Sequence, residues 1–94
     1  MIYFKSSLMI ENMSRQLVSV EQIRGARGLL GWSQTQLANA AGLSLPTVIR
    51  YETGGAKVSQ EAVDKMRAAL ESAGVVFVDE NGGGAGIRLK KPKK

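Results

Sequence analysis

Apolar residues recur with the spacing of amphipathic helices over most of the chain. Ser19 followed three residues later by Gln22 is the pattern of a capping box, which satisfies free backbone amides where a helix begins. Ser33 and Gln36 repeat that pattern. Together with the apolar stripes between them, the caps and the glycines predict four helices, over about residues 20–30, 34–41, 45–52 and 60–73.

The second and third predicted helices meet at a tight turn. Glycine adopts the left-handed conformation without steric cost, so the second helix is expected to end near Gly42. Ser44 then caps the third helix, which places Pro46 in the first turn, where a missing amide costs nothing. The pattern therefore predicts two short helices joined across a turn of about three residues.

After Gly74 the pattern changes to that of a β-hairpin. Residues 75–78 are β-branched or aromatic, and Ile87 and Leu89 alternate with basic residues beyond a turn-rich stretch. The lysines around Pro92 form a tail that is expected to stay solvated. We therefore divide the chain into an extension, a helical domain, a hairpin and a basic tail, at residues 1–18, 19–74, 75–90 and 91–94. Whether residues 1–12 are a native arm or precede the true start at Met13 stays open.

The amino-acid composition excludes several classes of function. The 94 residues are one domain's length, and they include no histidine and no cysteine, which excludes imidazole catalysis, thiolate chemistry and common zinc sites. We expect no enzyme, no metal and no cofactor. Thirteen Lys and Arg against eight Asp and Glu give a net charge of +5, which favours a polyanionic partner. No apolar run reaches the roughly 18 residues of a membrane span, so a soluble cytoplasmic protein without membrane contact is expected.

Between Ser33 and Gly54 the chain reads SQTQLANAAGLSLPTVIRYETG. This stretch has Ser-Gln at its first helix, Leu-Ala inside it, Ala-Gly at the turn and Tyr-Glu-Thr-Gly at its close, and an Arg-Gly pair precedes it. In these features the chain resembles the Cro/repressor-type (XRE) helix-turn-helix family over about residues 20–74. The resemblance implies a mainly α, four-helix repressor-like domain with an added hairpin. It also implies a sequence-specific DNA-binding regulator of bacterial or phage type, acting as a dimeric repressor.

The resemblance assigns base contacts to the third predicted helix. Members of the family often carry amides or hydroxyls at its first two positions, whereas Leu45 and Pro46 offer only apolar contact, for example to thymine methyl groups. The Arg50 guanidinium can bond either the two acceptors of guanine or a DNA phosphate, and both interpretations stay open. The expected base contacts are Leu45, Pro46, Thr47, Ile49 and Arg50.

The resemblance also assigns contacts to the DNA backbone. Gln34 is expected to be exposed, with no role in the core, and to hold a phosphate at the positive end of the second helix. The same residues could instead form a cap or a solvated loop. The expected backbone contacts are Ser33, Gln34, Thr53, Gly54, Gly55 and Lys57. Arg27 and Glu52 occupy the positions of a structural ion pair behind the DNA-facing surface.

The hairpin is the expected dimer surface, because an isolated two-stranded ribbon leaves an apolar face and open edges to cover. Packing against the chain's own helices is the alternative. A homodimer on a palindromic operator is the favoured assembly. An antitoxin that also binds a toxin partner, and a scaffold similar to the multiprotein bridging factors, stay open as other functions. The residues assigned to the dimer surface are Val76, Phe77, Val78, Ile87 and Leu89.

Overall fold

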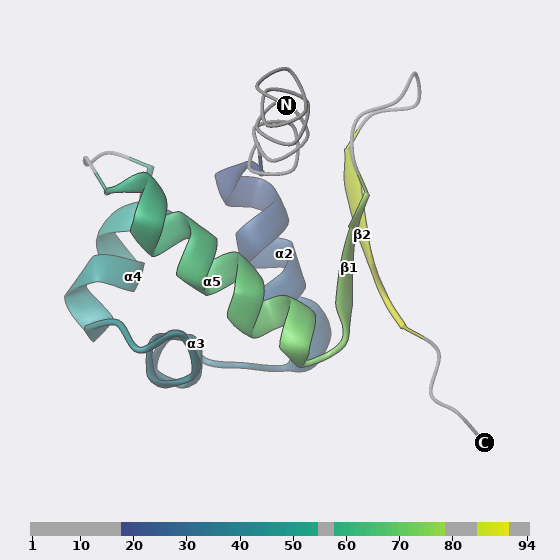
Figure 1. The fold of residues 1–94 in the computed structure, drawn as a ribbon, viewed down its shortest axis with the longest axis horizontal. Coiled ribbons are helices and arrows are strands. Elements are labelled where there is room, and N and C mark those ends of the chain that lie inside the picture. The colour runs from purple at the N-terminus through teal and green to yellow at the C-terminus, as the bar shows by residue number, and fades with distance from the viewer. Residues whose placement is uncertain (1–17, 55–57, 79–84, 91–94) are drawn as a thin grey trace, which may run out of the picture.

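A computed structural model describes residues 18–54, 58–78 and 85–90 of the chain. Within these residues it contains helices α2 (Val20–Leu30), α3 (Gln34–Ala41), α4 (Leu45–Glu52) and α5 (Gln60–Ser72), and strands β1 (Val75–Val78) and β2 (Gly86–Leu89) (Figure 1). The four predicted helices and the predicted hairpin are confirmed. The expected extension up to residue 17 and the basic tail of residues 91–94 lie outside the described residues.

Serine caps begin the four helices where the sequence predicts them. The hydroxyls of Ser19, Ser33, Ser44 and Ser59 each accept a hydrogen bond from the backbone amide three residues on. In the first two cases a glutamine side chain returns the bond to the serine amide, which completes both capping boxes. Gly42 ends α3 with a φ of +71°, in the left-handed region. These local bonds fix where each helix begins and how the chain turns between them.

Each described helix contributes to a single core. The largest fully buried side chains come from α2, α3, α4 and α5, and β1 adds two buried residues of its own. Figure 1 shows α4 at one end of the molecule and the hairpin at the other, with α5 running between them. The core therefore holds the hairpin and α4 in fixed positions. Its largest fully buried members are Ile23, Leu37, Val48, Met66 and Leu70.

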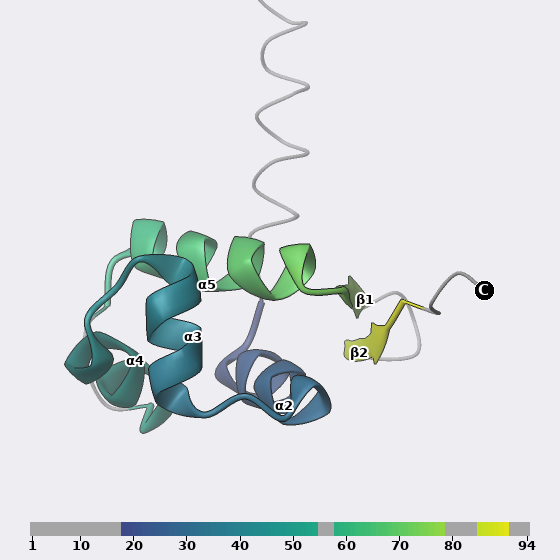
Figure 2. The same ribbon diagram turned by 90° about the horizontal axis from the view of Figure 1, so that it is seen from below.

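The hairpin packs against α2 and α5 through one of its faces. Strand β1 pairs antiparallel with β2, with Phe77 opposite Ile87. Figure 2 shows β1 on the α5 side of the ribbon and β2 on the α2 side. The buried Gln22 side chain on α2 donates from Nε2 to the carbonyls of Gly86 and Val78, at 3.1 and 3.5 Å. One amide thus joins both strands to the helix.

This packing changes the expected dimer surface. The sequence offers Phe77 and Ile87 for contacts between copies, yet Phe77 is 8% exposed in the core of its own chain and Ile87 packs against that core. The Arg67 guanidinium on α5 also lies 5.2 Å from the centre of the Phe77 ring. Those two side chains are already used within the chain. The other members of the predicted surface, Val76, Val78 and Leu89, are half-buried or exposed.

Two glycines of α2 test how closely the hairpin packs. A Cβ at Gly28 would meet nothing within 4 Å, so Gly28→Ala should raise the free energy of unfolding by about 0.5–1 kcal/mol through helix propensity. A Cβ at Gly25 would lie 2.7 Å from Cδ1 of Ile87, so Gly25→Ala should gain less or destabilise. Combining Gly25→Ala with Ile87→Val removes that methyl group and should recover part of the difference. Urea denaturation measures all three, and equal gains for both alanine variants would contradict this packing.

Candidate nucleic-acid interface

Helix α4 turns one side away from the core. Val48 and Glu52 are buried, four residues apart on the inner side of the helix. On the outer side Leu45 and Ile49 are 36% and 40% exposed, and Pro46 is exposed beside them. More than a third of the surface of Leu45 and of Ile49 therefore stays in solvent on a short, well-capped helix. They are available to contact a partner.

Arg50 and Thr47 differ in how free they are. Arg50 is exposed, and its guanidinium makes no ion pair within the described residues. The Thr47 hydroxyl instead lies 2.8 Å from the Ser44 hydroxyl at the helix cap. Of the five base-contact candidates, Thr47 is therefore the one whose polar group already has a partner. Arg50 is the candidate with an unused charged group.

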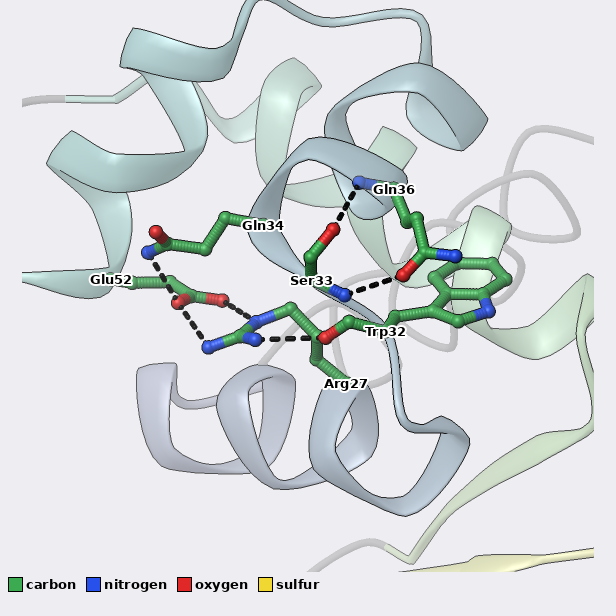
Figure 3. A network of polar contacts seen from close by, with 6 residues as sticks. All are labelled: Arg27, Trp32, Ser33, Gln34, Gln36 and Glu52. Carbon is green, nitrogen blue, oxygen red and sulfur yellow. Dashed lines mark hydrogen bonds and ion pairs between the residues drawn. The ribbon is translucent and has the colours of Figure 1, made fainter.

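A buried carboxylate holds three helices together behind this surface (Figure 3). The Glu52 side chain is only 4% exposed, and Arg27 on α2 reaches both of its oxygens, from Nε at 2.8 Å and from Nη2 at 2.9 Å. Arg27 Nη1 also donates to the carbonyl of Trp32 at 2.9 Å. Two parallel bonds from a guanidinium fix both distance and orientation. The structure thus places the two residues of the predicted ion pair in direct contact.

Gln34 differs from its expected surroundings. The sequence indicates an exposed residue without a structural role, whereas the side chain is half-buried and its Nε2 donates to Glu52 Oε1 at 2.9 Å. The reason is that a buried carboxylate needs several donors, and α3 begins beside the end of α4. No local pattern signals this bond, because its partners are 18 residues apart. The amide keeps a second N–H and its oxygen for other contacts.

The remaining backbone-contact candidates are placed in part. Ser33 is exposed and acts as the α3 cap. Thr53 and Gly54 are exposed after α4, and the Thr53 hydroxyl donates to the Arg50 carbonyl at 2.9 Å. Gly55 and Lys57 lie outside the described residues. Contacts of these side chains with DNA stay predictions.

The charges near α4 also affect Tyr51. Burial raises the pKa of its phenol above 10.0, and the nearby carboxylates of Glu21 and Glu52 raise it further. The phenol is therefore neutral at physiological pH, and it packs against the core as an uncharged group.

Among the described residues, no cluster of acidic side chains could hold a metal ion. None of the described helices is long and apolar enough to cross a membrane.

The buried pair predicts a characteristic response to substitution. Arg27→Leu leaves the Glu52 carboxylate in the interior with the Gln34 amide as its one remaining donor among the described residues, which should cost about 3 kcal/mol of unfolding free energy. Arg27→Leu with Glu52→Leu removes the stranded charge and should cost less than the single variant. Urea denaturation of both proteins measures the difference. A double variant that is less stable than Arg27→Leu would show that the pair contributes mainly by its mutual attraction.

Comparison with known proteins agrees with this geometry. No curated protein matches the chain. A family model described as helix-turn-helix matches residues 23–73, which is more than half of the chain and includes α3, the turn and α4. The capped α3, the left-handed Gly42 and the outward-facing α4 are the parts of the structure that correspond to this motif. The chain belongs to the Cro/repressor-type (XRE) helix-turn-helix family of DNA-binding regulators.

Proposed function

We propose that this protein binds double-stranded DNA sequence-specifically by placing α4 in the major groove. The observation that carries the proposal is the outer side of α4, where exposed apolar residues lie beside Arg50, which has no ion pair in the part of the chain that the structure describes, on a helix whose inner side is fixed in the core. A major groove about 12 Å wide admits one helix. The capped turn before α4 and the buried Glu52 at its end set the angle at which the helix is presented.

The side chains on α4 suit a particular readout. Leu45, Pro46 and Ile49 provide apolar surface for the methyl groups of thymine. Arg50 provides the two donors that match O6 and N7 of guanine. Thr47 contributes less hydrogen bonding, since its hydroxyl is shared with Ser44. The preferred site should therefore combine thymines with a guanine.

The DNA backbone would lie across the beginning of α3. Free amides in the first turn and the positive end of the helix favour a phosphate there. Gln34 would donate its second N–H to that phosphate while the first remains on Glu52. Thr53 and Gly54, with Gly55 and Lys57, would contact phosphates beyond the other end of α4. These contacts hold the protein in register and carry no sequence information of their own.

Two copies are needed for a selective regulator. One recognition helix reads a few base pairs, and Leu45 and Pro46 reduce its polar readout. Two copies related by a two-fold axis would read a palindromic operator, with recognition helices about 34 Å apart on one side of the duplex. Such a dimer would act as a repressor by occupying the operator, and it would work in the cytoplasm, where the genome lies.

Selection from random double-stranded DNA tests the function directly. A sequence-specific regulator should enrich a short motif, and a dimer should enrich it as an inverted repeat. Hydroxyl-radical footprints on the enriched duplex should then show protection on one face of the DNA. Recovery of unrelated sequences with no common motif would refute the proposal.

Arg50→Ala should separate base readout from phosphate contact. If Arg50 bonds guanine, its loss should cost about 1–3 kcal/mol of binding free energy on the preferred site and less on random duplex. Arg88→Ala is a matched control, because it removes an exposed arginine from the hairpin, at the other end of the molecule from α4. Fluorescence anisotropy with both duplexes measures the effect. Equal losses on the two duplexes would assign Arg50 to a phosphate.

Affinity should also fall steeply with salt. Each phosphate neutralised by a lysine or arginine adds roughly 0.9 to the slope of log affinity against log salt concentration. With a net charge of +5, the protein should show a slope well above that of a single contact. Anisotropy between low and physiological salt gives the slope. A flat titration would contradict binding to DNA.

A further inference from the structure

The two edges of the hairpin are defined by one backbone hydrogen bond. The amide of Lys90 donates to the carbonyl of Gly74 at 2.8 Å, directly beyond the paired strands. In an antiparallel pair, residues that bond their partner alternate with residues that face the opposite edge. Counting from this bond, Val76 bonds within the ribbon, whereas the amides and carbonyls of Val75 and Phe77 face the outer edge of β1. The sheet has two strands in the described residues, so this edge has no strand beside it.

The edges of β1 and β2 differ in charge. Among the described residues of the hairpin, β1 reads Val-Val-Phe-Val and carries no charge, whereas β2 carries Arg88 and is followed by Lys90. Charged side chains, and lysine above all, are the usual protection of an exposed strand against pairing with another chain. Two β2 strands side by side would also bring basic groups together. Within the described residues the edge of β1 has neither form of protection, so it is the edge suited to pair with an identical strand.

We infer that the edge of β1 binds the β1 edge of a second copy, in an antiparallel arrangement centred on Val76. In this register Val75 of one copy bonds Phe77 of the other, and the reverse, so the outward amides and carbonyls of both residues are satisfied. Val76 then faces its own counterpart across the two-fold axis as a non-bonded pair, with the Cα atoms about 4.5 Å apart. The choice of a second copy as the occupant rests on the proposed function, which requires two copies.

This pairing has a geometric consequence for DNA binding. Antiparallel edge pairing of identical strands is generated by a two-fold axis perpendicular to the sheet. Both copies therefore keep the same face of a continuous four-stranded sheet, ordered β2, β1, β1, β2. The face that carries Phe77 packs on the helices in each copy, so both sets of helices lie on one side of that sheet. Because α4 lies at the end of each copy away from the hairpin (Figure 1), both α4 helices would lie on that same side of the sheet, as binding to a single duplex requires.

A pair of four-residue strands buries little surface compared with a stable interface of about 1,600 Å². The association should thus be weak without DNA, and covalent capture is the appropriate test. The chain contains no cysteine, so a single introduced thiol reports only on its own position. Disulfides form when Cα atoms are about 4.4–6.8 Å apart. Only a residue on the two-fold axis meets that limit.

The experiment compares three variants of the full chain under mild oxidation. Val76→Cys should yield a disulfide-linked dimer on non-reducing gels, faster when operator DNA from the selection is present. Val78→Cys is the matched control on the same strand and face, because its two copies would be roughly 13 Å apart along the strands. Leu89→Cys tests the other edge, since three strand spacings, about 14 Å, would separate the two thiols. Neither control should cross-link at a comparable rate.

The outcomes separate this surface from the proposed function. If Val76→Cys cross-links but the protein enriches no common DNA motif, the β1 contact stands and the DNA-binding function is refuted. A folded Val76→Cys that binds its operator without cross-linking, or faster linkage of Leu89→Cys, would overturn the β1 pairing. If Val76→Cys does not fold by circular dichroism, sedimentation of Val76→Lys and Val78→Lys on operator DNA replaces it. Two ammonium groups facing each other at residue 76 should leave one copy per duplex, whereas the residue 78 variant should keep two, and two copies for both would refute the register.

Discussion

The orientation of α4 depends on a carboxylate that the fold has removed from water. A buried anion is costly unless donors replace its hydration, and Glu52 receives them from α2 and α3 rather than from its own helix. The last residue of α4 is thereby tied to two other helices. One turn earlier Val48 is held in the apolar core. With two points on its inner side fixed, α4 cannot rotate without stranding the charge, and its outer side chains keep one direction.

The same carboxylate connects the interior of the protein to its candidate DNA surface. Gln34 is bonded to Glu52, and Arg27 links Glu52 to the carbonyl of Trp32, just before α3. A phosphate bound by Gln34 would therefore meet an amide whose position is already set. Preorganised donors lose less entropy on binding than free side chains do. In the proposed complex, stability and recognition would thus share one network, and the half-buried position of Gln34 follows from its bond to Glu52.

Local chemistry made much of the fold predictable. Ser19 and Ser33 with their glutamines, and Gly42 at the turn, act within a few residues, and a sequence shows such patterns directly. Gln22 also bonds the hairpin, and Gln34 bonds Glu52. Both contacts join residues far apart in the chain, so no spacing rule reveals them. The family resemblance supplied the positions of Arg27 and Glu52. It could not supply Gln34 as a third member, because that assignment depends on where α3 begins relative to the end of α4.

Which face of the hairpin is buried could not be predicted in the same way. Alternation separates two faces of a strand, but β1 is apolar at every position, so the sequence does not say which face is inside. The helices decide it, because Gln22 reaches the carbonyls of both strands and Ile87 fits against the bare backbone of Gly25. The hairpin consequently belongs to the same packed body as α4. Any assembly through the outer edge of β1 would then set the spacing of two recognition helices through rigid packing, with no flexible linker between the dimer contact and the DNA contact.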